Sequence, residues 1–122
     1  MESGNKINSF EDLIVWQKSI KLSVFVYKLS AKFPKEEIFG LTSQIRRASN
    51  SVSLNISEGS VRSTKTFINQ LSIARGSASE VLSASILANE LEFIKSDDVS
   101  QLRPIITEIT KMLNSLMSSL KK

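Results

Sequence analysis

Few side chains in this sequence could perform chemistry, and the best candidates are carboxylates. The chain contains no His and no Cys, so the commonest general base and the thiol nucleophile are both missing. The carboxylates to consider for a metal site inside a helical bundle are Glu58, Glu80, Glu90 and Glu92. A di-iron bundle also needs Glu-x-x-His motifs, which cannot occur without His. We interpret these Glu residues as solvated or salt-bridged, and we predict no catalytic residue, no metal site and no cofactor.

The glycines offer no nucleotide site either. Gly40, Gly59 and Gly76 are too far apart to form a phosphate-binding loop, and no Walker motif is present. We therefore predict that the protein is not an enzyme and has no small-molecule substrate.

The basic residues are the stronger functional candidates. Sixteen Lys and Arg against twelve Asp and Glu give a formal charge of +4, a modest excess that is compatible with a polyanionic partner. The candidate nucleic-acid-binding residues are Lys18, Lys21, Lys28 and Lys32 on one flank of the first predicted helix, and Arg62 and Lys65 at the turn into the third. They would bind the phosphate backbone without base specificity. The alternative is a solubilising flank with structural ion pairs.

Arg46 and Arg47 are adjacent, so their directions on a helix differ by about 100°. We predict structural salt bridges within or between subunits, with Glu58 or Glu80 as partners. Contact with another molecule is the alternative.

Four predicted helices must position these side chains. Apolar residues repeat with helical spacing, and no segment alternates with a period of two over the length of a strand. The helices are expected at about residues 11–33, 41–58, 63–92 and 97–120, after a flexible N-terminus at residues 1–9. Short connections favour antiparallel neighbours. The sequence predicts one all-α domain over residues 1–122, an up-down antiparallel four-helix bundle.

Several residues predict how these helices end and pack. Ser9, with Asp12 three residues later, and Ser96 are candidate N-caps. Gly59 suits a left-handed C-cap. Pro104 predicts a kink or a ragged first turn, and Gly76, in mid-helix, predicts a close backbone contact.

The first helix has two apolar faces, whereas a surface helix of a lone domain needs one. One face carries Leu13, Trp16, Ile20, Val24 and Tyr27, and the opposite face carries Val15, Leu22, Val26 and Leu29. We predict that the second face is the core and that the first, which has the aromatic residues, contacts another subunit. The reverse assignment remains open.

The composition also bounds the location of the protein. No apolar run approaches the roughly 20 residues of a membrane span, and the N-terminus lacks an apolar signal core. We predict a cytoplasmic protein with no membrane partner.

Several motifs resemble a known family. They are Phe10–Gln17 (FEDLIVWQ), Phe39–Ala48 (FGLTSQIRRA), Asn55–Ser60 (NISEGS) and Ile73–Ser77 (IARGS). They resemble the bundle proteins encoded in intervening sequences of 23S rRNA, a family that includes the accessory variability determinant of diversity-generating retroelements. The resemblance implies a homopentameric ring without catalysis. For the retroelement member it implies binding of a reverse transcriptase and of nucleic acid through a basic surface.

These observations lead to one functional hypothesis and one alternative. The hypothesis is a non-enzymatic, homopentameric accessory protein that binds RNA or DNA, a reverse transcriptase, or both. The alternative is a scaffold that binds another protein and no nucleic acid.

Overall fold

The computed structural model describes residues 9–122, so most of the expected flexible N-terminus lies outside the described residues. Four α-helices follow one another, α1 (Ile14–Ser30), α2 (Leu41–Gly59), α3 (Thr64–Glu90) and α4 (Ser96–Leu120). Short 3-10 turns at Phe10–Asp12 and Lys35–Glu37 precede α1 and α2. The predicted all-α four-helix bundle is confirmed.

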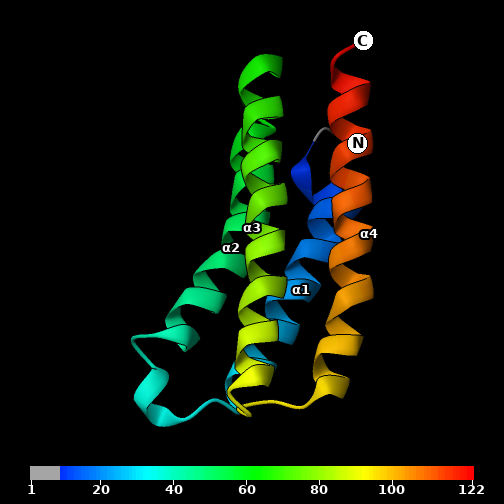
Figure 1. Cartoon of the computed structure of the whole chain (residues 1–122). Coiled ribbons are helices and arrows are strands. Elements are labelled where there is room, and N and C mark those ends of the chain that lie inside the picture. Colours follow the sequence, from blue (N-terminus) through cyan, green and yellow to red (C-terminus); the bar gives the residue numbers. More distant parts are fainter. Residues whose placement is uncertain (1–8) are drawn as a thin grey trace.

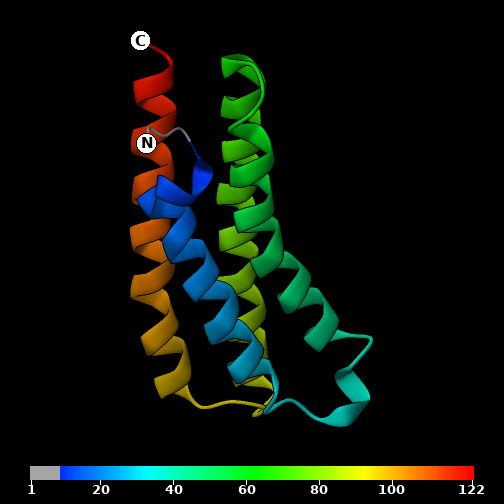
Figure 2. The ribbon, with the colours of Figure 1, turned by 180° about the vertical axis from the view of Figure 1, so that it is seen from behind.

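Each helix packs against its neighbours in the chain, and α1 also packs against α4, which closes the bundle. Figure 1 shows the helices running alternately up and down, and Figure 2 shows α1 lying between α4 and α2 on the opposite side. We call the end with the α2–α3 turn and the C-terminus of α4 the upper end. The lower end carries the α1–α2 and α3–α4 connections.

The core assignment for the first helix is confirmed. Val15, Leu22, Val26 and Leu29 are all buried, with exposed fractions of 4% or less. They pack with the inner stripes of the other helices, which include Ile45 and Val52 of α2, Leu71, Ala78 and Val81 of α3, and Leu102, Ile109 and Leu113 of α4. The period of 3.6 residues in the sequence was sufficient to find this core.

The first helix is shorter than predicted at both ends. The Ser9 hydroxyl accepts a hydrogen bond from the Glu11 amide, so it caps the 3-10 turn rather than the α-helix. Leu13 is extended (ψ 121°) and separates the 3-10 turn from the α-helix. The Phe10 ring packs edge-on against Trp16. At the other end, the chain leaves the helix after Ser30, four residues before Pro34.

The left-handed cap predicted at Gly59 is wrong, and the close contact predicted at Gly76 is not made within the described chain. Gly59 lies inside α2 and has no positive φ. A Cβ there would stand 2.8 Å from the Phe67 ring and 3.2 Å from the Gln70 Cβ, so the glycine allows α2 and α3 to approach closely. Gly76 shows the opposite, because a Cβ at this position would meet no described atom within 4 Å. Its predicted close contact does not exist within the described chain.

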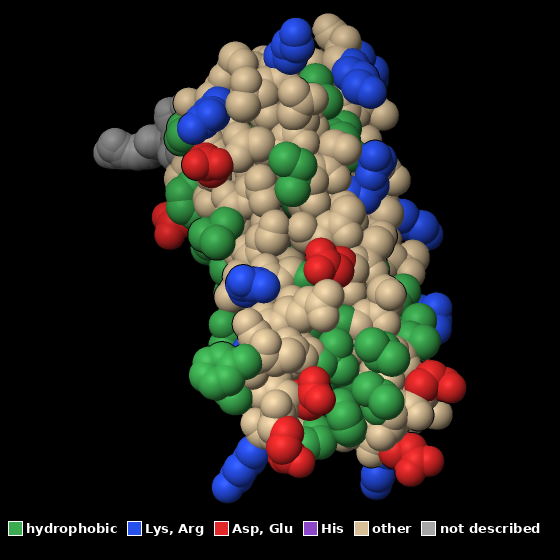
Figure 3. All heavy atoms as spheres, turned by 60° about the vertical axis from the view of Figure 1, so that its left-hand side comes forward, with side chains coloured by type: hydrophobic (Ala, Val, Ile, Leu, Met, Phe, Trp, Pro, Cys, Tyr) green, Lys and Arg blue, Asp and Glu red, His purple; other side chains and the backbone are tan. Residues whose placement is uncertain are grey.

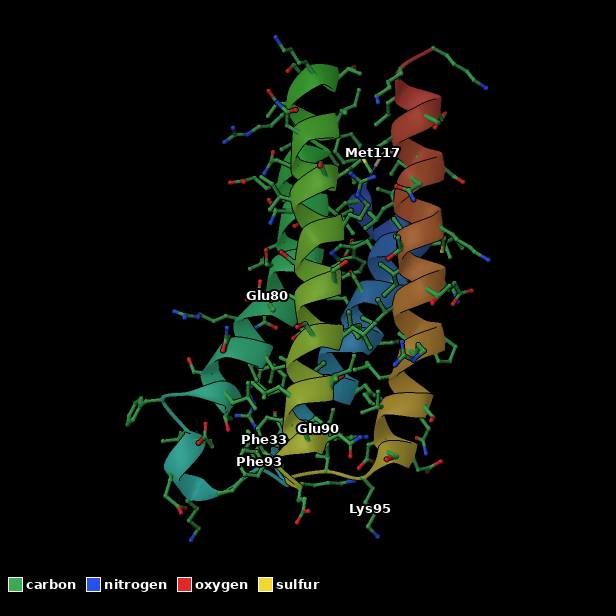
Figure 4. All side chains as sticks on the ribbon, viewed as in Figure 1. Phe33, Glu80, Glu90, Phe93, Lys95 and Met117 are labelled. Atoms are coloured by element: carbon green, nitrogen blue, oxygen red, sulfur yellow. The ribbon has the colours of Figure 1, made fainter. Side chains whose placement is uncertain are left out.

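A left-handed residue ends α3, and it is not glycine. Glu92 has φ 65°, its amide donates to the Asn89 carbonyl, and the Phe93 amide donates to the Ala88 carbonyl. These two bonds form a Schellman motif. The motif turns the Phe93 ring onto Phe33, with 5.8 Å between the ring centroids, at the lower end of the bundle (Figure 4).

The start of α4 also differs from the prediction. The N-cap is Lys95 rather than Ser96, and the Asp98 carboxylate accepts a hydrogen bond of 2.9 Å from the Lys95 amide. This backbone hydrogen bond lowers the pKa of Asp98, and the nearby Lys32 ammonium lowers it further, against the opposing effect of burial. The first turn is therefore well capped, and α4 continues through Pro104 without ending.

Candidate nucleic-acid and subunit surfaces

The four lysines of the first helix do not form one free basic row. Lys18 forms a salt bridge of 3.1 Å with Glu108, and Lys32 forms one of 3.1 Å with Asp98, both on α4. Lys21 and Lys28 are exposed, and neither has an ion-pair partner among residues 9–122. The flank therefore has two exposed cations, Lys21 and Lys28, beside two paired ones. Lys18 links α1 to α4, and Lys32 links the turn after α1 to α4.

The two basic residues at the α2–α3 turn lie at the upper end, as the sequence placed them. Lys65 is exposed in the first turn of α3. Arg62 is about half exposed, with its Nη2 3.9 Å from a Glu58 oxygen. This distance indicates a weak pair, because exposed ion pairs contribute little to stability.

Arg46 bridges α2 and α1 without a carboxylate partner among the described residues. Its Nε donates to the Ser30 hydroxyl at 2.8 Å, its Nη2 donates to the Tyr27 carbonyl, and its guanidinium lies 4.6 Å from the centre of the Tyr27 ring. The cation thus lies against the C-terminal turn of α1, where the helix dipole favours it. Arg47 is exposed on α2, and within residues 9–122 of one subunit it forms no salt bridge with Glu58 or Glu80.

The carboxylates considered for a metal site lie apart. Glu58 accepts a hydrogen bond of 2.6 Å from the Gln70 amide. Glu80 and Glu90 lie at different heights on α3 (Figure 4). Within the described part of the chain, no group of three acidic side chains lies close enough to hold a metal ion.

The predicted subunit face of α1 divides into two parts. Leu13 and Trp16 are partly buried and pack against the core. Ile20, Val24 and Tyr27 are exposed by 38%, 51% and 42%. The Tyr27 hydroxyl accepts a hydrogen bond of 2.9 Å from Asn50 on α2, so its ring is held in place. The outer apolar surface of α1 is therefore smaller than predicted.

Other apolar side chains are exposed away from α1. Phe39 is 95% exposed at the lower end and Val61 is 80% exposed at the upper end. Ile73, Ile86, Leu87 and Leu91 are each between 39% and 54% exposed on α3. Ile73, Leu87 and Leu91 fall away from the inner stripe of that helix, a pattern that predicts a second covered face.

A polar groove between α3 and α4 was also missed. It occupies about 450 Å³ near the upper end, with Asn69, Ser72 and Arg75 on the α3 side and Asn114, Ser118 and Lys121 on the α4 side. Its side chains are neutral or basic. The signal for it was the spacing of Lys111, Asn114, Ser118 and Lys121, which places them along one flank of a helix.

Charge is segregated along the bundle. From Thr64 to Arg75, α3 contains Lys65 and Arg75 and no acid, whereas from Gly76 to Glu92 the chain contains three Glu and no base. From Arg103 onwards, Glu108 is the single acid against four Lys and Arg, and it pairs with Lys18. In Figure 3, basic side chains dominate the top and the upper right-hand edge, with some acidic ones at the upper left. Most of the acidic side chains lie lower down, where a few basic ones also occur.

None of the helices in residues 9–122 combines the length and the hydropathy that crossing a membrane requires. In this part of the chain, the fold and the surfaces define a small helical-bundle protein whose distinctive features are a polarised charge pattern and exposed apolar side chains.

Comparison with known proteins identifies the family. The profile of the 23S rRNA-intervening sequence protein family matches residues 11–115, and the chain belongs to this family. The fold is similar to a crystal structure of a protein of unknown function from the S23 ribosomal protein family of Bacteroides thetaiotaomicron VPI-5482. The TM-score is 0.74 and the identity 30%, over 85% of this chain and 98% of that chain. No curated protein matches the chain.

Proposed function

We propose that this protein is a non-enzymatic accessory protein of the cytoplasm that binds RNA or DNA through their phosphate backbone and acts as a homo-oligomer. The observation that carries the proposal is the charge segregation, since the upper halves of α3 and α4 contain bases with a single, already paired acid. A cluster of one sign of charge attracts a polyanion more strongly than the net charge of +4 alone suggests.

The exposed apolar side chains support the oligomeric part of the proposal. Cyclic rings use two different faces of each subunit, whereas a two-fold dimer uses one face twice. The protein has two exposed apolar faces of this kind, one around Val24 on α1 and one around Leu87 on α3. The family resemblance implies five subunits.

Salt-dependent binding tests the nucleic-acid part. Anisotropy of a labelled single-stranded RNA and of a labelled DNA duplex, each of arbitrary sequence, is titrated with the full chain between about 50 and 200 mM salt. We expect similar affinities for unrelated sequences and a linear fall of log K with log salt. Absence of binding at the lowest salt, or binding that ignores salt, contradicts the proposal.

A second candidate function is a scaffold that binds a protein, such as a reverse transcriptase, and no nucleic acid. The observation in its favour is Phe39, a large apolar side chain that is 95% exposed. A complex with a purified reverse transcriptase that forms equally well at low and high salt, without any RNA or DNA binding, would favour this function.

A further inference from the structure

The polar groove between α3 and α4 brings together two cations, Arg75 and Lys121, and several neutral hydrogen-bonding side chains. We propose that the phosphodiester backbone of bound RNA or DNA lies in this groove. This inference rests on the proposed nucleic-acid binding. Arg75 and Lys121 are then the cations that contact phosphate, and the lysine flank of α1 is not the binding surface.

The electrostatics of the groove favour an anion. Neither Arg75 nor Lys121 has an ion-pair partner among the described residues, and no carboxylate lines the groove. The α1 flank differs, because Glu108 and Asp98 already neutralise Lys18 and Lys32. A phosphate entering the groove therefore meets two cations with no carboxylate beside them in the lining.

The helix dipole explains one of these cations but not the other. Lys121 directly follows α4, where the partial negative charge of a helix C-terminus favours a cation. Arg75 lies in the interior of α3, far from both ends, so no dipole accounts for it. Its Nη1 donates a hydrogen bond of 2.6 Å to the Asn114 side-chain oxygen, which fixes the guanidinium across the two helices. Other guanidinium N–H groups remain available for the paired contacts that phosphate accepts.

The length of the groove and its neutral side chains also suit the sugar-phosphate backbone of a nucleic acid. The amides of Asn69 and Asn114 and the hydroxyls of Ser72 and Ser118 are donors of the kind that contact phosphate and sugar oxygens. Ile68 and Met117 complete the lining, and Met117 lies between α3 and α4 in Figure 4. Asn114 and Lys121 are about 10 Å apart along the helix, so the groove is long enough to contact successive phosphates of one strand.

Two matched pairs of variants test the site in the full chain. Arg75→Gln with Lys121→Gln removes both groove cations, and Lys21→Gln with Lys28→Gln removes two free cations of α1. Asn114→Asp keeps the acceptor for Arg75 but places a carboxylate in the groove. Gln44→Glu makes the same change in charge at the exposed lower end of α2. Thermal unfolding and light scattering are used to check that each variant keeps the fold and the assembly of the wild-type chain.

We expect the groove double variant to lose about tenfold in affinity for labelled single-stranded RNA. We also expect it to lower the slope of log K against log salt by about 1.4, the contribution of two phosphate contacts to a single strand. Asn114→Asp should weaken binding and Gln44→Glu should not. Equal losses in the two double variants would overturn the groove assignment while leaving the proposed function intact. A wild-type chain that binds no RNA or DNA would overturn both. Binding of labelled polyglutamate in the groove, without RNA binding, would assign the groove to an acidic protein segment instead.

Discussion

Gly59 and Gly76 show how the same residue type serves different purposes at two positions. Each glycine needs an explanation in a helical protein. The left-handed cap predicted at Gly59 is wrong, and the close contact predicted at Gly76 is not made within residues 9–122. The reason is physical, because the atoms that decide the matter belong to other parts of the structure. The Phe67 ring of α3 limits the space at Gly59, and no described atom limits it at Gly76.

Alanine substitutions at these glycines should therefore have opposite effects. We expect Gly59→Ala to lower the free energy of unfolding by about 1 to 3 kcal/mol through overpacking, which exceeds the gain of up to about 1 kcal/mol in helix propensity. Gly76→Ala should raise it by up to about 1 kcal/mol. Urea denaturation of both variants measures the two changes.

Two results would contradict this interpretation. A neutral or stabilising Gly59→Ala would mean that Phe67 moves aside without cost. A destabilising Gly76→Ala whose effect grows with protein concentration would mean that a second subunit covers Gly76.

At the scale of the helix, the core stripes were predictable and the ends were not. The buried face of α1 follows from spacing alone, because a period of 3.6 residues fixes one side of a helix. The ends depend on individual hydrogen bonds. Ser96 is a better N-cap by type than Lys95, but the Asp98 carboxylate binds the Lys95 amide and moves the cap by one residue.

The end of α3 yields a stability prediction. Glu92 occupies the left-handed position of a Schellman motif, where a side chain costs about 1 to 2 kcal/mol relative to glycine. Glu92→Gly should therefore raise the free energy of unfolding by about 1 kcal/mol. Glu90→Gly, the same substitution two residues earlier and inside the helix, should lower it by up to about 1 kcal/mol. Chemical denaturation of the two variants measures both changes in the free energy of unfolding. Equal changes of the same sign would refute the left-handed Schellman position of Glu92.

At the scale of the molecule, the bundle followed from the sequence but the basic surface did not. Helical spacing and short connections were enough to predict four antiparallel helices. The sequence could not show which lysines of the α1 flank are paired, because their partners Glu108 and Asp98 lie far along the chain. The groove was missed because its two walls belong to different helices.

The proposed homo-oligomer leads to a prediction about the mass of the protein in solution. We expect the wild-type chain to have a mass in solution of five times 13.6 kDa. Val24→Glu should lower this mass, because Val24 is 51% exposed on α1 and a carboxylate there would be costly to bury in a subunit contact. Light scattering measures both masses.

Gln44→Glu is the control for this experiment, because it introduces a carboxylate at an exposed polar position. A wild-type chain that stays at 13.6 kDa at micromolar concentration would refute the oligomer. An unchanged mass for Val24→Glu would place the subunit contact elsewhere, with the α3 surface around Leu87 as the next candidate.

The separation of bases from acids along the helices has a consequence before any contact is made. The bundle possesses an electric dipole moment along its long axis, with the positive pole at the α2–α3 turn and the end of α4. A long polyanion exerts a torque on such a particle during diffusion, so the protein rotates and arrives with this pole leading. Added electrolyte shortens the range of the torque, and orientation is then left to chance collisions.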